Sequence, residues 1–142
     1  MYSKKVIEHF SHPKNMGKID RPDGVGKVGN VICGDVMHLY IKVGQNDVIE
    51  DIKYETFGCV AAISSSSMIT EMVKGKTIFE ALKIEKSSIV DSLEGLPKAK
   101  IHCSVLAIDA LSESIYDYLK KNKRDIPDFL EKRHKITVKN AK

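Results

Sequence analysis

The clearest pattern in the sequence is a pair of segments, 35–43 and 48–57, in which apolar and polar residues alternate. Alternation of this kind predicts half-buried β-strands. The apolar sides carry Met37, Leu39, Ile41 and Val43 in the first segment and Val48, Ile52 and Tyr54 in the second. The turn-forming residues 44–47 lie between the two segments, so the pattern predicts a β-hairpin.

A turn centred between Gln45 and Asn46 sets the register that we expect for this hairpin. The resulting pairs on the apolar side are Val43 with Val48, Leu39 with Ile52, and Met37 with Tyr54. If the strands stay paired to their base, Cys33 lies opposite Gly58 and beside Cys59. The hairpin would thus bring two distant cysteines together.

Helical spacing and capping residues predict the remaining elements. A first helix is predicted to be capped by Ser3, with Val6, Ile7 and Phe10 on its apolar side, and a second to run from Cys59 to Gly75, with Ile63, Ile69, Met72 and Val73 buried. Two short helices are predicted to be capped by Thr77 and Ser88. The longest predicted helix runs from Cys103 to Lys121, and its apolar stripe consists of Val105, Ile108, Leu111, Ile115, Tyr118 and Leu119. Proline and glycine in 13–29 favour a loop there. These elements predict an α+β fold with a small antiparallel sheet of about three strands and helices packed on one face.

The four consecutive serines 64–67 are unusual inside a predicted helix. They suit either a polar, solvated face or close packing of small side chains, and we expect packing.

Composition narrows the class of protein. The chain has 142 residues, of which 42% are hydrophobic and 30% charged, which predicts one compact domain. No apolar run reaches the length of about 18 residues that a membrane span requires, and a glutamate and a histidine interrupt the first ten residues before an export signal could form. Three cysteines cannot all pair within one chain. We therefore expect a soluble, cytoplasmic protein with free thiols and no membrane partner.

The net charge of +4 is unevenly distributed. Residues 120–142 hold nine Lys or Arg against three acids, so the rest of the chain is mildly acidic. With few aromatic residues and no basic cluster elsewhere, the sequence does not predict a nucleic-acid partner. We divide the chain into a domain over 1–122 and a basic tail over 123–142 that is helical or frayed.

The three cysteines have further donors beside them at the ends of predicted elements. Asp35 follows Cys33 and Gly34, and His102 precedes Cys103, while Cys59 begins a predicted helix. Taken singly, each cysteine is better explained as a buried small hydrophobe than as a ligand. Together they offer three sulfurs, one carboxylate and one imidazole, which suits iron–sulfur chemistry better than structural zinc because paired C-x-x-C spacing is absent.

Several motifs together resemble the IscU family of iron–sulfur cluster scaffolds, which is also found as the amino-terminal domain of NifU. They are Cys33-Gly34-Asp35-Val36-Met37, Gly58-Cys59, the serines 64–67, Val73-Lys74-Gly75-Lys76 and Ile101-His102-Cys103-Ser104, with His12-Pro13-Lys14-Asn15 near the start. The resemblance covers about residues 2–120.

This resemblance implies a scaffold, rather than an enzyme, on which a 2Fe-2S cluster is assembled and then handed to apo-proteins. The implied ligands to iron are Cys33, Cys59 and Cys103, completed by Asp35 or His102. A cysteine desulfurase of the IscS or NifS type would deliver sulfur as a persulfide onto Cys103, and a ferredoxin or another electron donor would reduce it. Lys100 is implied to orient the site, with a solvated surface lysine as the alternative. A homodimer is among the implied assemblies.

The chain departs from the family pattern in one motif. Leu96-Pro97-Lys98-Ala99-Lys100 resembles the loop recognised by a dedicated Hsp70-type chaperone, but Lys98 stands where a second proline is usual. Use of that chaperone is therefore an open expectation.

Three other functions compete with the scaffold. A SufU-type sulfur acceptor binds zinc with the same cysteines and aspartate, but that branch resembles this chain less, since it usually carries an insertion before the third cysteine and lacks the histidine found here as His102. Zinc also suits the mixed donors of the empty scaffold. A Cys-His hydrolase would use Cys103 as nucleophile, although neighbouring side chains at a helix start normally diverge. A purely structural adaptor leaves the donor placement unexplained.

Overall fold

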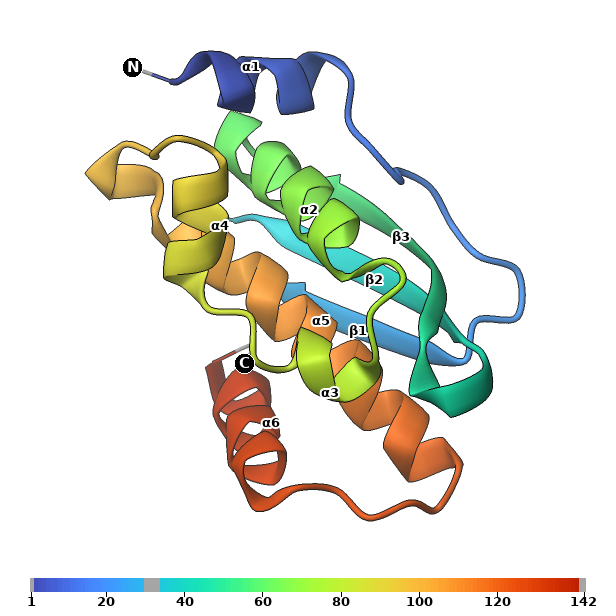
Figure 1. Ribbon diagram of the computed structural model, residues 1–142. Coiled ribbons are helices and arrows are strands. Elements are labelled where there is room, and N and C mark those ends of the chain that lie inside the picture. Colours follow the sequence, from blue (N-terminus) through green and yellow to red (C-terminus); the bar gives the residue numbers. More distant parts are fainter. Residues whose placement is uncertain (1, 30–33, 141–142) are drawn as a thin grey trace.

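The computed structural model describes residues 2–29 and 34–140. Its helices and strands follow one another in a single α+β arrangement (Figure 1). They are α1 (Lys4–Ser11), β1 (Gly24–Gly29), β2 (Val36–Val43), a 3-10 turn (Gln45–Asp47), β3 (Ile49–Phe57), α2 (Val60–Val73), α3 (Ile78–Ala81), α4 (Lys86–Ser92), a second 3-10 turn (Lys98–Lys100), α5 (His102–Lys121) and α6 (Asp128–Asn140).

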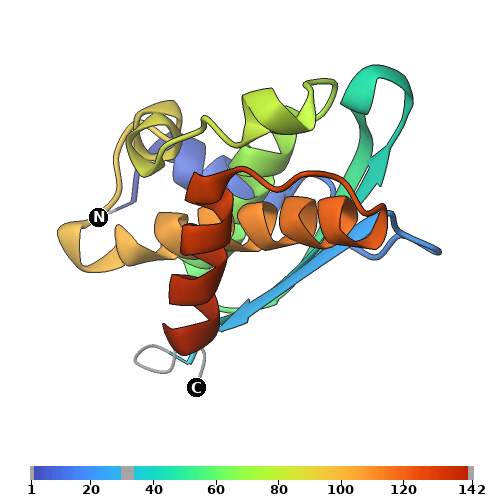
Figure 2. The ribbon, with the colours of Figure 1, turned by 90° about the horizontal axis from the view of Figure 1, so that it is seen from below.

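The three strands form one small antiparallel sheet, as predicted, and their order is β1-β2-β3. Helices α2 and α5 lie on the same face of the sheet, and α6 packs on α5 (Figure 2). None of the helices in the described ranges is long and apolar enough to cross a membrane.

The alternating pattern predicted β2 and β3 correctly but placed their register two residues off. Leu39 faces Tyr54, and Ile41 faces Ile52. The shift arises because Asn46 and Asp47 adopt left-handed conformations in a longer turn, and the pairing is irregular between Lys42 and Val43. A shift of two keeps Met37, Leu39 and Ile41 of β2 and Ile52 and Tyr54 of β3 on their predicted buried face.

The corrected register changes which residues meet at the base and tip of the hairpin. Pairing of Val36 with Phe57 brings Asp35 opposite Gly58. Cys33 itself lies outside the described residues. At the other end, Ile49 is fully buried where Val48 was expected, because β3 begins one residue later.

Strand β1 occupies part of the segment that was expected to be a loop. Its sequence, Gly24 to Gly29, has three glycines and lacks a strand-like apolar pattern. A Cβ atom on Gly24 would overlap the carbonyl oxygen of Ser114, and one on Gly26 that of Ala110. The glycines therefore allow the backbone of α5 to lie directly on the strand, which is a packing function that residue patterns do not reveal.

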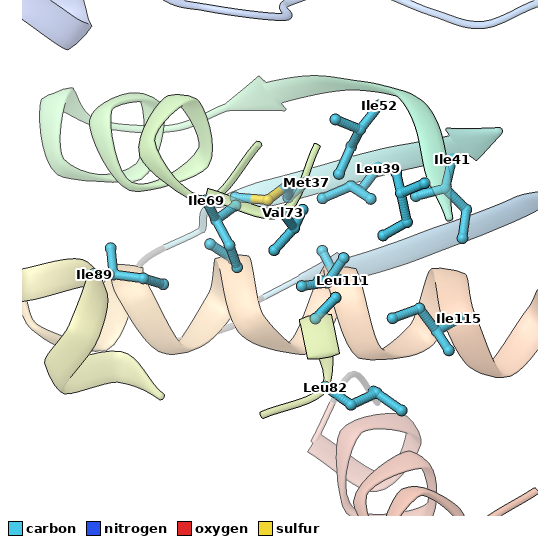
Figure 3. Packing of buried hydrophobic residues seen from close by; sticks show 14 of the residues in the cluster. Met37, Leu39, Ile41, Ile52, Ile69, Val73, Leu82, Ile89, Leu111 and Ile115 are labelled. Atoms are coloured by element: carbon cyan, nitrogen blue, oxygen red, sulfur yellow. The ribbon is translucent and has the colours of Figure 1, made fainter. Parts of the chain in front are cut away.

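The main core fills the space between the sheet and the helices (Figure 3). Its labelled members are Met37, Leu39 and Ile41 from β2, Ile52 from β3, Ile69 and Val73 from α2, Leu82 and Ile89 from the α3 and α4 region, and Leu111 and Ile115 from α5. All of them are buried, so the predicted inner faces of β2 and α2 are confirmed at these positions.

The serine run of α2 is packed, as expected. All four side chains, Ser64 to Ser67, are fully buried. Ser64 Oγ donates to the carbonyl oxygen of Val6 at 2.8 Å, and Ser66 Oγ donates to that of Ala62 at 2.7 Å. Small hydroxyl side chains thus let α1 approach α2 while the hydroxyls of Ser64, Ser66 and Ser67 find partners. The buried hydroxyl of Ser65 has no partner among the described residues.

Two other helices differ from expectation. Helix α4 begins at Lys86 with Glu85 as its N-cap, so Ser88 lies inside the helix rather than capping it. In α5, Val105 is exposed and Ile108 half-buried, whereas Leu106, Ala107 and Ala110 are buried. The buried stripe is rotated because α5 faces both the glycine-rich β1 and α2, where small side chains fit best.

The basic tail is helical over α6, and this helix is attached to α5. Leu130 is fully buried in the main core, and the rings of Tyr116 and His134 stack with centroids 3.8 Å apart. Nδ1 of His134 lies 2.8 Å from a carboxylate oxygen of Glu113. The domain boundary at residue 122 stays a prediction.

Helix α1 is fixed to α2 through a buried histidine. Ser3 caps α1 as predicted, but its inner face presents Val6 and His9, whereas Ile7 and Phe10 are exposed. Nδ1 of His9 lies 2.7 Å from Ser67 Oγ, which also accepts a hydrogen bond from the backbone N–H of Lys14. Burial lowers the pKa of His9 below its ordinary value of 6.5, and nearby Lys5 and Lys14 act in the same direction against Glu71 and Glu8.

We expect Gly26→Ala to lower the free energy of unfolding by about 1–3 kcal/mol, because the added methyl group would push α5 away from β1. Gly29→Ala is the matched control in the same strand, since a Cβ atom there has ordinary contacts, 3.7 Å or more from its neighbours. Urea unfolding of both variants measures the difference. Equal stability of the two variants would contradict the close-packing explanation of β1.

His9 should make the fold less stable as the pH falls. Its folded-state pKa is lowered, so below about pH 6.5 the unfolded chain binds a proton more readily than the folded chain. His9→Gln cannot take up that proton. We expect the stability lost between about pH 7.5 and about pH 5.5 in urea unfolding to be smaller in this variant. Exposed His12→Gln is the control and should keep the wild-type loss.

Candidate metal centre

Four predicted donor residues meet where β3 ends and where β2, α2 and α5 begin. Asp35 directly precedes β2, and Cys59 follows the end of β3 as the N-cap residue of α2. His102 and Cys103 form the first turn of α5. The hairpin therefore supplies two donors at its base, and α5 carries the other two to the same place.

The donor atoms are close enough to hold one metal ion or one small cluster. Sγ of Cys103 lies 3.6 Å from Sγ of Cys59, 3.6 Å from Oδ2 of Asp35 and 3.6 Å from Nε2 of His102. Cys59 Sγ lies 3.8 Å from the same oxygen of Asp35. Ligand atoms of Asp35, His102 and Cys103 all fall within 4.8 Å of one another.

The site is shielded from solvent on its inner side. Cys103 is fully buried and Asp35 is only 6% exposed, while Cys59 and His102 are half-buried. Ala61 and Ala62 of α2 form a small apolar cluster with Cys103. Tyr2 and Leu96 pack against this cluster. These four wall residues were not predicted, because nothing in an alanine, a tyrosine or a leucine at these positions marks it as facing a metal centre.

The electrostatics of the site favour a bound cation. Burial raises the pKa of the Cys103 thiol well above its ordinary value, and the neighbouring Cys59 and Asp35 raise it further. Two thiols and a carboxylate in one shielded pocket therefore disfavour negative charge on Cys103. A metal ion reverses this effect, because its positive charge stabilises the thiolate form of a ligating cysteine. The mixture of sulfur, oxygen and nitrogen donors suits iron or zinc.

The motif that contains Cys33 is described only from Gly34 onward. Cys33 lies outside the described residues, so its place in the ligand set stays a prediction. Gly34 has a left-handed backbone with φ +74°, as expected for a glycine that redirects the chain between two donors. A non-glycine residue there would be strained.

Lys100 lies in the 3-10 turn that leads into α5, two residues before His102. It is half-buried, and its backbone N–H donates to the carbonyl oxygen of Pro97 at 2.8 Å. Within the described ranges, none of the hydrogen bonds or ion pairs joins its ammonium group to the four donors. Its orienting role stays a prediction.

The expected divergence of His102 and Cys103 is wrong, because Nε2 of His102 and Sγ of Cys103 are in contact at 3.6 Å. The contact alone does not produce a hydrolase nucleophile. Such a nucleophile requires a lowered thiol pKa, whereas the pKa of Cys103 is raised. The arrangement therefore fits metal ligation better than hydrolysis.

Comparison with known proteins agrees with this geometry. The family described as "NifU-like N terminal domain" matches residues 1–125. The chain belongs to this family. The match ends before α6 begins.

Curated relatives in the family are similar over most of the chain. The iron-sulfur cluster assembly scaffold protein IscU 1 of Archaeoglobus fulgidus is 62% identical over 122 residues, which cover 86% of this chain and 79% of that protein. The IscU scaffold protein of Haemophilus influenzae is 53% identical and matched over 84% of this chain and 97% of its own length. The Escherichia coli IscU scaffold protein is 50% identical, with 87% and 97% covered.

Solved structures share the fold. The amino-terminal part of a NifU-like protein from Brucella abortus superimposes with a TM-score of 0.72 at 22% identity, over 84% of this chain and 94% of that one. A SufU scaffold protein from Fervidobacterium islandicum superimposes with a TM-score of 0.67 at 24% identity, over 80% and 96% of the two chains. The NifU-like fold is therefore retained at low identity.

Proposed function

We propose that this NifU-like chain is a scaffold on which an iron–sulfur cluster is assembled and from which it passes to acceptor apo-proteins. The convergence of Cys59, Cys103, Asp35 and His102 within contact distance is the observation that carries this proposal. The names of the relatives at 50–62% identity support it. The chain acts stoichiometrically, holding its cargo rather than turning over a substrate.

The cargo that fits the donors is a 2Fe-2S cluster. Cys59 and Cys103 supply soft sulfur ligands, and Cys33 would supply a third. Asp35 or His102 completes the set. Asp35 Oδ2 contacts both described thiols, whereas the described contact of His102 is with Cys103. More donors are present than four coordination positions need, so one ligand can replace another as the cluster is built or released.

Sulfur reaches the site as a persulfide made by a cysteine desulfurase and is transferred to Cys103. Because Cys103 is fully buried, delivery requires its surroundings, including Tyr2 and Leu96, to move aside while the desulfurase is docked. A ferredoxin or a similar electron donor supplies the electrons. Iron enters the same pocket, where the electron-rich donors stabilise its charge.

Other proposed properties rest on the same resemblance. An Hsp70-type chaperone would dock at the segment Leu96–Lys100, in which Lys98 and Ala99 are exposed. Assembly in the cytoplasm and a homodimeric form are proposals of the same kind.

Zinc-dependent sulfur acceptance is the second candidate, and the mixed donor set supports it because zinc binds cysteine, histidine and carboxylate ligands. The contact of His102 with Cys103 favours the scaffold, since it adds a donor that the SufU-like pattern lacks. Zinc found in the purified protein would then occupy the donor site in place of the iron–sulfur cluster.

The scaffold is tested by anaerobic reconstitution with iron, cysteine and a desulfurase, followed by visible absorption and by iron and sulfide analysis. We expect a 2Fe-2S spectrum and transfer to an apo-ferredoxin. Replacing all three cysteines by serine should abolish cluster binding while circular dichroism shows the fold retained. A protein that accepts persulfide sulfur but forms no cluster under these conditions would favour the zinc-dependent acceptor.

Asp35→Ala should hold its cluster several-fold longer than the wild type. A carboxylate is a harder ligand than a thiolate and binds iron of the cluster less firmly, so removing it leaves the cluster to the stronger donors. The measurement is the half-life of the absorption during transfer to an apo-ferredoxin. Exposed Asp20→Ala is the control and should behave as wild type. Faster loss from Asp35→Ala would refute this role of the carboxylate.

A further inference from the structure

Two thiols of different accessibility face each other in the metal centre. Sγ of Cys59 lies 3.6 Å from Sγ of Cys103, and Cys59 is half-buried whereas Cys103 is fully buried. A nucleophile attacks from a separation of about 3–3.5 Å. A small side-chain adjustment is therefore enough to bring one sulfur within reacting distance of the other.

We propose that Cys59 is a resolving thiol that releases sulfide from a persulfide carried by Cys103. The inference rests on the proposed function, in which Cys103 receives sulfur from a desulfurase. It assigns Cys59 a chemical step in addition to its role as a ligand.

The step balances without an external reductant. The sulfur of Cys59 attacks the inner sulfur, Sγ, of the Cys103 persulfide, and a bond forms between the two Sγ atoms. The bond between Cys103 Sγ and the outer sulfur breaks. The outer sulfur takes the electron pair of that bond and the proton of Cys59, and it leaves as hydrogen sulfide. The sulfur of Cys59 is oxidised to the disulfide level, Cys103 Sγ keeps the oxidation level that it has in the persulfide, and the outer sulfur is reduced to sulfide.

The surroundings of the pair favour this reaction over competing ones. Oδ2 of Asp35 accepts hydrogen bonds from both thiols, at 3.8 Å and 3.6 Å, and so holds them side by side. Ala61 and Ala62 pack around Cys103 and shield it from thiols in solution. Cys59 is the N-cap residue of α2, where the unpaired backbone amides favour the negative charge that a thiol develops as it attacks.

The product has a consequence for the order of assembly. Two sulfurs joined in a disulfide cannot both act as thiolate ligands, so two electrons must enter before Cys59 and Cys103 can bind the completed cluster. The substrate of the proposed electron donor is then the protein disulfide rather than the persulfide. Sulfide is released beside the iron-binding donors, where it is captured at once.

The test uses the full chain, fully reduced, freed of small thiols and kept anaerobic. It is mixed with a desulfurase that already carries a persulfide and has been separated from free cysteine. We expect the wild type to release sulfide as its Cys103 persulfide disappears, and peptide mass spectrometry to find a Cys59–Cys103 disulfide. Cys59→Ser and Cys59→Ala should keep the persulfide on Cys103 and release sulfide at least about tenfold more slowly.

Several outcomes would overturn the inference. These are sulfide release from both Cys59 variants at the wild-type rate, a disulfide between Cys33 and Cys103 in the wild type, or a persulfide that forms only on another cysteine. If circular dichroism shows that a Cys59 variant does not fold, the inference is decided by whether the wild type forms a Cys59–Cys103 disulfide.

A parallel reconstitution of the wild type with iron and inorganic sulfide separates this inference from the scaffold function. If the wild type forms a cluster with iron and inorganic sulfide but releases no sulfide after mixing with the desulfurase, the resolving role of Cys59 is refuted and the scaffold function stands.

Discussion

The direct contact between the backbones of β1 and α5 determines where the donors come together. Gly24 and Gly26 lack the side chains that would hold α5 away from the sheet. Helix α5 therefore lies close to the sheet, and its first turn reaches the edge where β2 begins and β3 ends. Only in that position can Cys103 contact Asp35 and Cys59, which come from the base of the hairpin.

This position of α5 also buries polar donor groups that add little to the stability of the fold. Cys103 and Asp35 are shielded from water, yet their contacts are with each other and with further donors. A buried carboxylate beside buried thiols is a poor substitute for apolar packing, because each group disfavours charge on its neighbours. The fold tolerates this arrangement because Leu39, Ile115 and the rest of the main core form a second, larger cluster of buried hydrophobic side chains. A cation relieves the unfavourable contacts, so binding of the cargo and stability of this corner are linked.

The sequence predicted what depends on local pattern and residue chemistry. Alternation identified β2 and β3, and the capping residues Ser3 and Thr77 marked two helix starts. The placement of polar side chains at the ends of elements predicted that Asp35, Cys59, His102 and Cys103 come together. The sequence did not predict β1, because glycines that serve close packing resemble those of a loop. The register of the hairpin was not predicted because it depends on left-handed residues in the turn. The start of α4 was not predicted because its N-cap residue, Glu85, makes no side-chain cap hydrogen bond. The walls of the pocket, including Tyr2 and Leu96, come from contacts between distant segments that no local pattern contains.

Helix α5 links these observations, because three different neighbours hold it in place. β1 fixes it through backbone contact, α2 through small side chains, and α6 through Leu130 and the stacked rings of Tyr116 and His134. Small residues and a few buried apolar side chains are enough for the first two of these contacts. Structures only 22–24% identical share the fold with TM-scores of 0.67–0.72. Helix α6 lies beyond the part matched by the family. A helix held so firmly presents Cys103 from a fixed base. The changes in distance that assembly and release require must then come from the other side of the pocket, from Asp35, Cys59 and the residues that cover them.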